Sequence, residues 1–516
     1  MKQLIFRLCL PVCLLAAACT PARNVTGSGD GKITVNFLQV NDVYEIAPVE
    51  AGKFGGMARV ASLKKELLIK NKNSFLIMAG DFLSPSVYNS LQYEGKRIRG
   101  RQMVEAMNAA GMDMAVFGNH EFDISESELQ SRINESDFQW VSSNSFHKTT
   151  AGISAFTKTT GAGSKIIPET YIINIKDADG TTARIGFIGI NIPFNKAAYV
   201  SYTDPMATAE KLYNQIKDSC DAVIAITHQL VQDDILLAQK LPGLAAILGG
   251  HEHDMRYQKV GNVIITKAHA NARSAYIISM DLNKKTGTKK IKVTLKMIDS
   301  TVPLDAATNE VVKKWNDIAE KNYASIGFDA KKIVLAKGEP LDAREAVIRK
   351  SATNFSKIII NAMEQASPDA AVAIVNSGSI RLDDVLQPPI SQYDILRSLP
   401  FGGSIAVVDM KGNLLKEILE AGRKNVGIGG FLHYSSAVSY DAINLQWTYK
   451  KSLIGNETIY KVALTDFLLT GGESNMGFLT KTNPGIIKVY PPVTAISDSR
   501  SDIRLAIIRY LEKLNF

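Results

Sequence analysis

Five short apolar segments of this sequence are each followed, within three residues, by a side chain that commonly binds metal ions. Amphipathic stretches such as Met57–Lys70 lie between several of them. Alternation of this kind predicts an α/β domain, in which ligands collect beyond the carboxyl ends of the strands. The sequence therefore predicts a single sheet edge where carboxylate, amide and imidazole groups meet. The segments and the residues after them are Ile33–Val40 with Asp42, Phe75–Ala79 with Asp81, Met112–Phe117 with Asn119, Ala222–Ile226 with His228, and Leu244–Leu248 with His251 and His253.

The chemistry of these residues indicates a metal centre. Carboxylate oxygens combined with imidazole nitrogens suit Mn, Zn, Fe or Co better than Ca or a metal that prefers thiolates. The chain has only seven His, and four of them follow predicted strands: His120, His228, His251 and His253. A single Asp after a strand is usually a turn residue, and a single His is usually a hydrogen-bonded core or loop residue. The prediction therefore rests on their joint occurrence.

The order of the motifs resembles the calcineurin-like metallophosphoesterases and, within them, the 5′-nucleotidase family. The motifs are Asp42-x-Tyr44, Gly55-Gly56, Gly80-Asp81, Gly118-Asn119-His120-Glu121, His228 and Gly250-His251-x-His253. Further landmarks extend the resemblance over nearly the whole chain: Asn376–Arg381, Leu399-Pro400-Phe401, Gly430-Phe431-Leu432 and Gly471-Gly472-Glu473. The resemblance implies an α/β fold with an N-terminal four-layer α/β/β/α sandwich, a connecting helix, and a second α/β (α+β) domain that binds the substrate.

The resemblance also implies two divalent metal ions. Asp42, Asp81 and His253 would hold one ion, and Asp81, Asn119, His228 and His251 the other, with Asp81 bridging. His120, oriented by Asp123, would stabilise the phosphoryl charge or protonate the leaving oxygen. The implied reaction removes phosphate from nucleoside 5′-monophosphates or related nucleotides by in-line attack of a metal-activated hydroxide.

One metal position departs from the family pattern. The first motif of the family is Asp-x-His, whereas this chain has Asp42-Val43-Tyr44, and a phenol is a poor ligand unless it is ionised. Three consequences stay open: Tyr44 ligates as a phenolate, as it can towards Fe(III); water or Glu45 completes the site; or the first metal binds weakly and activity falls. We expect a working site that is weaker or differently selective, because every other position is intact.

The substrate side is implied by matches in the C-terminal half. The matching residues are Asn376, Arg381, Phe431, Arg349 and Phe478, with Arg344 as the alternative to Arg349. Asn475 stands where the family has its second base-stacking ring, so either Phe478 supplies that ring or the base is held on one face only. Stacking is worth about 1–3 kcal/mol per base. We therefore expect weaker or broader base selection.

The N-terminal segment is typical of an export signal. Lys2 and Arg7 precede the apolar run Leu8–Ala18, which is too short to span a bilayer and ends in small residues before Cys19. It resembles a bacterial lipoprotein signal, in which a lipid on Cys19 would anchor the protein in the cell envelope, in the periplasm or at the cell surface. Plain secretion after cleavage at Ala18 is the alternative. The expected organisation is a signal peptide (1–18), a tether (19–31), a metallophosphoesterase domain (32–300), a connecting helix (301–339) and a substrate domain (340–516).

Composition narrows the possible partners. The net charge of +8 is spread along the chain, so we expect a small nucleotide but no nucleic acid as a partner, with the oligomeric state open. Three of the four Cys lie at or before the predicted cleavage point, which leaves Cys220 alone and excludes a disulfide framework in the mature chain.

Two other functions stay open. One is a phosphoesterase for a nucleotide sugar, a 2′,3′-cyclic nucleotide or a non-nucleotide phosphate, and the other is a metal-impaired nucleotide-binding lipoprotein.

Overall fold

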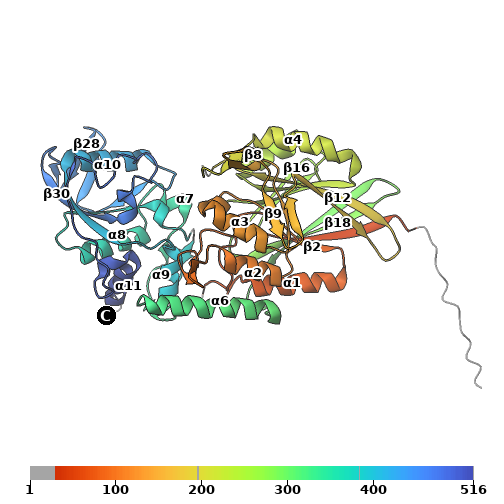
Figure 1. Ribbon diagram of the computed structural model, residues 1–516, viewed down its shortest axis with the longest axis horizontal. Coiled ribbons are helices and arrows are strands. Elements are labelled where there is room, and N and C mark those ends of the chain that lie inside the picture. Colours follow the sequence, from red (N-terminus) through yellow and green to blue (C-terminus); the bar gives the residue numbers. More distant parts are fainter. Residues whose placement is uncertain (1–28, 51, 195–196, 383, 515–516) are drawn as a thin grey trace, which may run out of the picture.

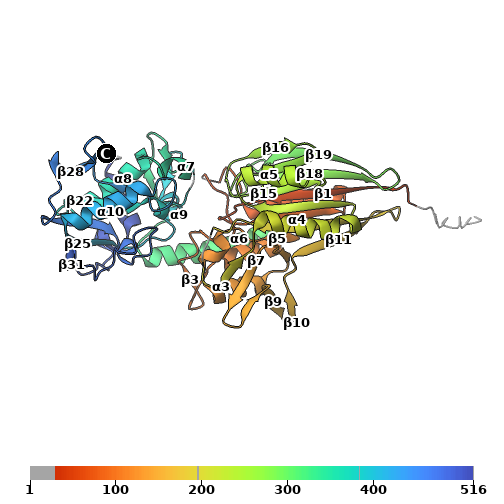
Figure 2. The same cartoon turned by 90° about the horizontal axis from the view of Figure 1, so that it is seen from above.

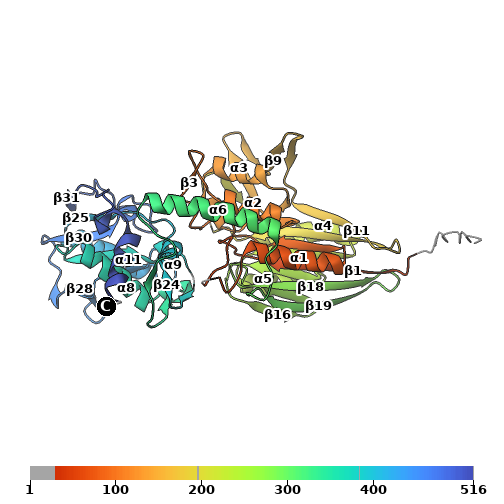
Figure 3. The ribbon, with the colours of Figure 1, turned by 90° about the horizontal axis from the view of Figure 1, so that it is seen from below.

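The computed structural model of the chain describes residues 29–50, 52–194, 197–382 and 384–514. It has two α/β parts, and the long helix α6 (Ala306–Ser325) runs from one to the other (Figures 1 and 3). The predicted signal peptide, most of the tether and the predicted lipidation site Cys19 lie outside the described residues. Within the described ranges, no helix is both long enough and apolar enough to cross a bilayer.

Two six-stranded sheets form the first part. The strands of one sheet are, in spatial order, β19 (Thr288–Met297), β18 (Ser274–Asn283), β1 (Lys32–Val40), β2 (Ser74–Met78), β5 (Met114–Val116) and β6 (Gln139–Val141). Those of the other are β11 (Thr170–Lys176), β12 (Thr182–Asn191), β14 (Ala222–His228), β15 (Ala246–Gly250), β17 (Val263–Lys267) and β16 (Arg256–Val260). The central strands run parallel, from β1 to β6 and from β12 to β17, and antiparallel strands flank them.

The two sheets pack face to face, and helices cover their outer faces. A buried cluster that includes Phe37, Ile77, Phe187 and Ile224 lies between the sheets. A second cluster packs the first sheet against α1 (Met57–Lys70) and α2 (Arg101–Ala109), and a third packs the second sheet against α4 (Pro205–Ile216) and α5 (Val231–Lys240). Burial on both faces explains why the central strands are almost continuously apolar. The predicted four-layer α/β/β/α sandwich is confirmed: α4 lies above the sheets and α1 and α2 lie below them in Figure 1, and Figure 2 views the same part from the side of α4 and α5.

The second part is built on a five-stranded mixed sheet. Its spatial order is β26 (Leu432–Tyr434), β22 (Val372–Asn376), β30 (Ile459–Thr465), β25 (Ile405–Lys411) and β31 (Ile486–Val489). Helix α10 (Gly412–Lys424) contributes Leu415 and Leu419 to the core on one face. Helices α8 (Asn354–Ala366) and α11 (Ile503–Leu514) pack together and join the core on the other face. This agrees with the predicted second α/β domain.

Shorter elements surround these cores. Around the sandwich they are β3 (Gln92–Tyr93), β4 (Lys96–Arg97), η1 (His120–Asp123), α3 (Glu126–Glu135), β7 (Ser145–Thr149), β8 (Gly152–Ser154), β9 (Thr157–Thr160), β10 (Gly163–Ile166), β13 (Val200–Tyr202) and η2 (Lys217–Ser219). In the C-terminal part they are β20 (Ile333–Leu335), β21 (Leu341–Asp342), α7 (Glu345–Ile348), η3 (Ser377–Ser379), β23 (Val385–Leu386), β24 (Ile390–Ser391), α9 (Gln392–Ser398), β27 (Val438–Asp441), β28 (Gln446–Tyr449), β29 (Ser452–Leu453), η4 (Asp466–Leu469) and η5 (Ser499–Ser501).

Local sequence signals locate several helices well. The predicted helix Met57–Lys70 coincides with α1, and the predicted capping box is present, since Ser125 accepts from the Glu128 N–H while the Glu128 side chain accepts from the Ser125 N–H. Strand β14 continues two residues beyond the apolar run and ends at His228 itself. The outer strand β19 was not predicted, because it is largely exposed and has no apolar run.

Polar contacts hold the two parts together near the edge of the first sheet. Arg273 of the sandwich pairs with Asp384 of the C-terminal part and lies 2.9 Å from Glu50. The Tyr393 hydroxyl donates to Glu45 Oε2 over 2.8 Å. These contacts place the C-terminal Arg381 against the sandwich.

Candidate metal centre and phosphate-binding site

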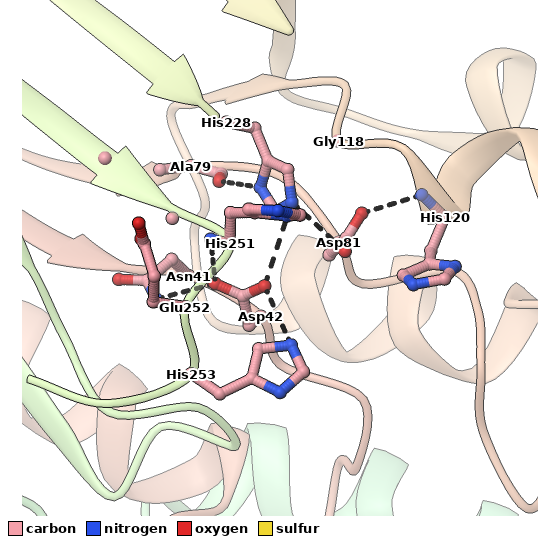
Figure 4. A network of polar contacts seen from close by, with 12 residues as sticks. Asn41, Asp42, Ala79, Asp81, Gly118, His120, His228, His251, Glu252 and His253 are labelled. Atoms are coloured by element: carbon pink, nitrogen blue, oxygen red, sulfur yellow. Dashed lines mark hydrogen bonds and ion pairs between the residues drawn. The ribbon is translucent and has the colours of Figure 1, made fainter. Parts of the chain in front are cut away.

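The predicted metal residues gather at the carboxyl ends of the central strands (Figure 4). Asp42 and Asp81 follow β1 and β2 of one sheet, His228 ends β14 of the other, and His251 and His253 follow β15. Asp42, Asp81 and His228 are buried and offer ligand atoms that all lie within 4.8 Å of one another. The predicted residues thus come together where the edges of the two sheets meet, whereas the alternation along the sequence predicted the edge of a single sheet.

The remaining candidates lie next to this group. His228 Nε2 is 3.1 Å from Asp81 Oδ2, and His253 Nε2 is 3.3 Å from Asp42 Oδ1. The His251 ring lies 5.3 Å from that of His228, centroid to centroid. Asn119 is buried, and its neighbour His120 donates its backbone N–H to Asp81 Oδ1 over 2.8 Å. All six candidate metal residues therefore belong to one neighbourhood.

The backbone at this edge is tightly constrained. Four of the six candidates have a positive φ: Asp42 (52°), Asp81 (57°), His251 (96°) and His253 (62°). Non-glycine residues rarely adopt this conformation, and it is enriched at functional sites. Gly80 also has a positive φ (81°), and a Cβ on it would lie 2.6 Å from His228 Nδ1. Glycine at this position allows the second strand end to approach the imidazole.

Two polar atoms point to a cation. Among the described residues, Asn119 Oδ1 and His228 Nε2 are buried without a hydrogen bond, although Asp81 is close to the imidazole. Buried polar atoms are nearly always satisfied, so each exception needs an explanation such as an ion. Two buried carboxylates lie beside these atoms. This donor set fits divalent ions of the Mn, Zn, Fe or Co class.

The pKa shifts of these residues also indicate a site for a cation. Burial opposes a charge on Asp81, but His228 and His120 lower the pKa of this carboxyl well below its usual range. Burial lowers the pKa of His228, but Asp81 and Asp42 raise it to about 9 overall. Burial, reinforced by His228, lowers the pKa of His251 to about 3. The carboxylates thus attract positive charge, and an ion that takes the place of the proton on His228 releases that proton.

Tyr44 lies among the residues assigned to the first metal. Its hydroxyl is 2.9 Å from His253 Nε2, 3.2 Å from Asp81 Oδ2 and 3.4 Å from Asp42 Oδ1. Burial, then Asp81 and Asp42, raise the pKa of this phenol well above its ordinary value. Glu45 is held elsewhere, by the Tyr393 hydroxyl and the Val87 N–H. The Tyr44 phenol, and not the Glu45 carboxylate, therefore lies beside the residues assigned to the first metal.

The motif around His120 has a second acidic residue whose role the sequence did not reveal. His120 Nδ1 is 2.6 Å from Asp123 Oδ2, as predicted for an oriented catalytic imidazole. The buried carboxylate of Glu121 accepts four backbone N–H groups, which belong to Gly118, Asp81, Phe82 and Leu83. Glu121 thus fixes the loop after β2 to the loop after β5.

Three side chains of the C-terminal part approach this site. Arg381 Nη2 is 2.7 Å from His120 Nε2, and Arg381 Nη1 is 3.5 Å from Glu345 Oε1. The same Glu345 oxygen is 2.7 Å from Arg349 Nη2. Arg344, the alternative to Arg349, instead forms a salt bridge with Asp342 and is largely exposed. The structure therefore brings Arg381 and Arg349 together through Glu345, and Arg344 does not belong to this group.

The candidate base-binding residues lie deeper in the C-terminal part. Phe431 borders a cavity of about 330 Å³, which is also lined by Ser356, Asn361, His433 and Tyr434. His433 is buried, and its Nε2 has no hydrogen-bond partner among the described residues. Asn376 donates to Glu473 over 2.6 Å. His433 was not predicted, because no sequence signal distinguishes it from a core histidine.

Asn475, which replaces the second ring of the base clamp, and the candidate ring Phe478 lie in one loop. Asn475 has a positive φ (59°) and donates to Asn425 over 2.7 Å. Phe478 is half-buried and packs against the core of the C-terminal part. The role of Phe478 as a second stacking ring stays a prediction.

Comparisons with known protein families divide the chain into the same two parts as the structure does. Residues 35–255 match the family described as calcineurin-like phosphoesterase, and residues 332–480 match the 5′-nucleotidase C-terminal domain. The 5′-nucleotidase of Bos taurus is 23% identical over 473 residues, which cover 81% of this chain and 78% of that protein. The trifunctional nucleotide phosphoesterase protein YfkN of Bacillus subtilis is 24% identical over 494 residues, which cover 86% of this chain and 32% of that protein. This chain thus spans about a third of the length of YfkN.

A solved structure has the same fold. The 5′-nucleotidase precursor from Thermus thermophilus superposes with a TM-score of 0.71 at 20% sequence identity, covering 93% of this chain and 97% of that chain. The likeness therefore extends over both α/β parts.

Proposed function

Because the chain belongs to the 5′-nucleotidase family, in which a calcineurin-like phosphoesterase domain precedes a 5′-nucleotidase C-terminal domain, we propose that it is a metal-dependent hydrolase of nucleoside 5′-monophosphates or related nucleotides. One observation carries the proposal. The buried Asp42–Asp81–His228 cluster lies beside an imidazole–carboxylate pair, His120 and Asp123. A site that only binds nucleotides has no need of that pair.

The proposal assigns two metal positions. Asp42, Asp81 and His253 would hold one ion, and Asp81, Asn119, His228 and His251 would hold the other. When bound, such ions activate water and neutralise phosphoryl charge in an in-line displacement. The location of the Tyr44 hydroxyl, between His253 and both carboxylates, supports a role for Tyr44 at the first position.

The chain's own residues complete the chemistry. Asp123 holds the Nδ1 side of the His120 ring, so Nε2 faces outward and meets Arg381. A phosphoryl oxygen that takes the place of this contact receives a hydrogen bond from the guanidinium. His120 Nε2 then lies beside the departing oxygen, where it stabilises charge or delivers a proton.

The nucleoside end of the substrate is assigned to the C-terminal cavity. Phe431 offers one stacking face, and His433 offers a polar side chain at the cavity wall. Asn475 replaces the second ring, and this observation favours a second candidate with broader selectivity. That candidate prefers a nucleotide sugar, a 2′,3′-cyclic nucleotide or a non-nucleotide phosphate.

We also propose that the protein works outside the cytoplasm. The support is the sequence of residues 1–19, with its charged start, short apolar run and Cys19. A lipid on Cys19 would anchor the protein in the bacterial cell envelope. Mass spectrometry of the mature N-terminus tests this. A free amino group on residue 19 without a lipid would favour plain secretion.

Phosphate release from a panel of nucleotides tests the catalytic proposal. Wild type and His120→Ala are compared with added Mn, Zn, Co or Mg and with chelator. Metal-dependent release by the wild type supports hydrolysis, and no release from any compound would refute it and favour the metal-impaired binding lipoprotein. Release from AMP no faster than from a simple aryl phosphate would favour the second candidate.

A further inference from the structure

Glu345 lies at a position where a carboxylate is not expected if the site only has to attract phosphate. It begins α7, and its Oε1 lies 2.7 Å from Arg349 and 3.5 Å from Arg381. The three side chains are between 10% and 20% exposed. Such partly buried ion pairs are screened less by solvent than surface pairs.

This trio connects the metal centre to the nucleoside cavity. On one side, Arg381 contacts His120. On the other side, the backbone carbonyl of Arg349 accepts from Gly427, which belongs to the loop that carries Phe431. The Ser377 N–H, four residues before Arg381, donates to the Phe431 carbonyl over 2.8 Å. The three side chains therefore lie between His120 on the metal side and the loop that carries Phe431.

The charges of the trio limit what can pass. Two guanidinium groups and one carboxylate give a net charge of +1, instead of the +2 of the arginines alone. Arg381 Nη2 lies 2.7 Å from His120 Nε2, so this arginine presents a donor on the side of the metal centre. A single phosphoryl group at the metals meets that donor, but a second phosphate further along the passage meets the Glu345 carboxylate. Juxtaposed like charges reject a ligand strongly when they are poorly solvated.

We propose that Glu345 is a specificity-determining residue that admits one phosphate between the metal centre and the nucleoside cavity, and so selects nucleoside monophosphates against di- and triphosphates. The inference rests on the proposed function and names the substrate class of the same site. Glu345 acts through electrostatic repulsion and through the position it gives to both arginines, and it has no part in the chemical step.

The test replaces Glu345 by Gln, which keeps the shape and removes the charge. The metal-loaded full chain is assayed for phosphate release from the mono-, di- and triphosphate of one nucleoside. Glu345→Asp is the conservative variant, and Asp342→Asn is the matched control, because Asp342 pairs with Arg344 outside the site and belongs to a separate ion pair. We expect Glu345→Gln to raise kcat/KM for the triphosphate relative to the monophosphate by about tenfold. Glu345→Asp and Asp342→Asn should keep the wild-type ratio.

The ratio of kcat/KM for the triphosphate to that for the monophosphate distinguishes misfolding from lost selectivity, because misfolding lowers the rates with all three nucleotides together. An unchanged ratio in Glu345→Gln would overturn the proposal, as would a wild type that hydrolyses the triphosphate as fast as the monophosphate. If no nucleotide is hydrolysed, the proposed function has failed, but Glu345 is still tested by calorimetric binding of inorganic phosphate and pyrophosphate. Glu345→Gln should then tighten pyrophosphate about tenfold more than phosphate, and equal changes would overturn the proposal.

Discussion

Replacing Lys267 by Met is expected to weaken both the fold and the metal centre. The Lys267 side chain is 1% exposed, and its ammonium lies 2.9 Å from Asp234 Oδ2 and 2.6 Å from Glu252 Oε2. It also donates to the carbonyl of Gln229 over 2.5 Å and to that of Gly250 over 2.8 Å. Gln229 follows His228 and Gly250 precedes His251. One buried ammonium therefore ties together the ends of the two strands that carry these imidazoles.

The expected magnitude follows from burial. Removing one partner of a buried ion pair costs about 3–5 kcal/mol, because the other charge stays behind. In the variant, Asp234 and Glu252 lack their cation, and burial raises the pKa of both carboxyls above the unfolded-state value. An acid with a raised folded-state pKa destabilises the fold as pH rises above the unfolded-state pKa. The loss of stability should therefore be larger at pH 8 than at pH 5. Metal affinity should fall by about 10–100-fold, as for other residues that position metal ligands.

Denaturant unfolding at both pH values and calorimetric metal titration measure the two effects. The triple variant Lys267→Met, Asp234→Leu, Glu252→Gln removes every charge, so it should regain stability but not metal affinity. Lys240→Met is the matched control, because Lys240 pairs with Glu210 at the surface, where such pairs contribute about 0–1 kcal/mol. If Lys267→Met binds metal within twofold of the wild type, the positioning argument is wrong. A loss of less than about 1 kcal/mol would refute the burial argument.

Four further predictions concern the site and its surroundings. His120→Ala should lower phosphate release by about 100–10,000-fold without lowering metal content by elemental analysis; lost metal would instead make His120 a ligand. Tyr44→His should tighten the weaker of two metal-binding steps in a titration, and unchanged binding would contradict a role for Tyr44 at the first site. Chelation should abolish activity and lower Tm, because ions that bind only the folded state stabilise it; an unchanged Tm would mean that little ion was bound. Burial lowers the pKa of His433 from 6.5 to about 4. Between these pH values the unfolded chain binds a proton on this imidazole and the folded chain does not. The free energy of unfolding should therefore fall by about 3 kcal/mol as pH drops from 6.5 towards 4. His433→Asn should flatten that part of the pH–stability curve, and a curve of unchanged slope would assign the titration to another group.

The metal residues were predictable because their signal is local. Each one follows an apolar run, and the geometry of parallel strands brings the ends of such runs to one edge. Gly80 precedes Asp81 and has a positive φ, which lets the chain turn sharply after β2. The two α/β parts were predictable for the same reason, since buried parallel strands are continuous apolar segments.

The partners of the site were not predictable, because they depend on tertiary contacts. Lys267 is the last residue of the apolar strand β17, and nothing in the sequence indicates that its ammonium lies between two carboxylates. The choice between Arg349 and Arg344 needed the short helix α7, which directs Arg349 towards Arg381 through Glu345. His433 and Glu345 are single polar residues without a motif. Their surroundings come from segments far apart in the chain.

The left-handed backbone at Asp42, Asp81, His251 and His253 has a consequence for the order in which the protein is assembled. An unfolded chain rarely holds even one such residue in this conformation, and here four must hold it together. The strand ends that carry them come from both sheets, so no binding site exists before the sandwich has closed. We therefore expect the ions to enter last. Metal present during refolding should leave the early rate unchanged and should slow unfolding of the finished protein.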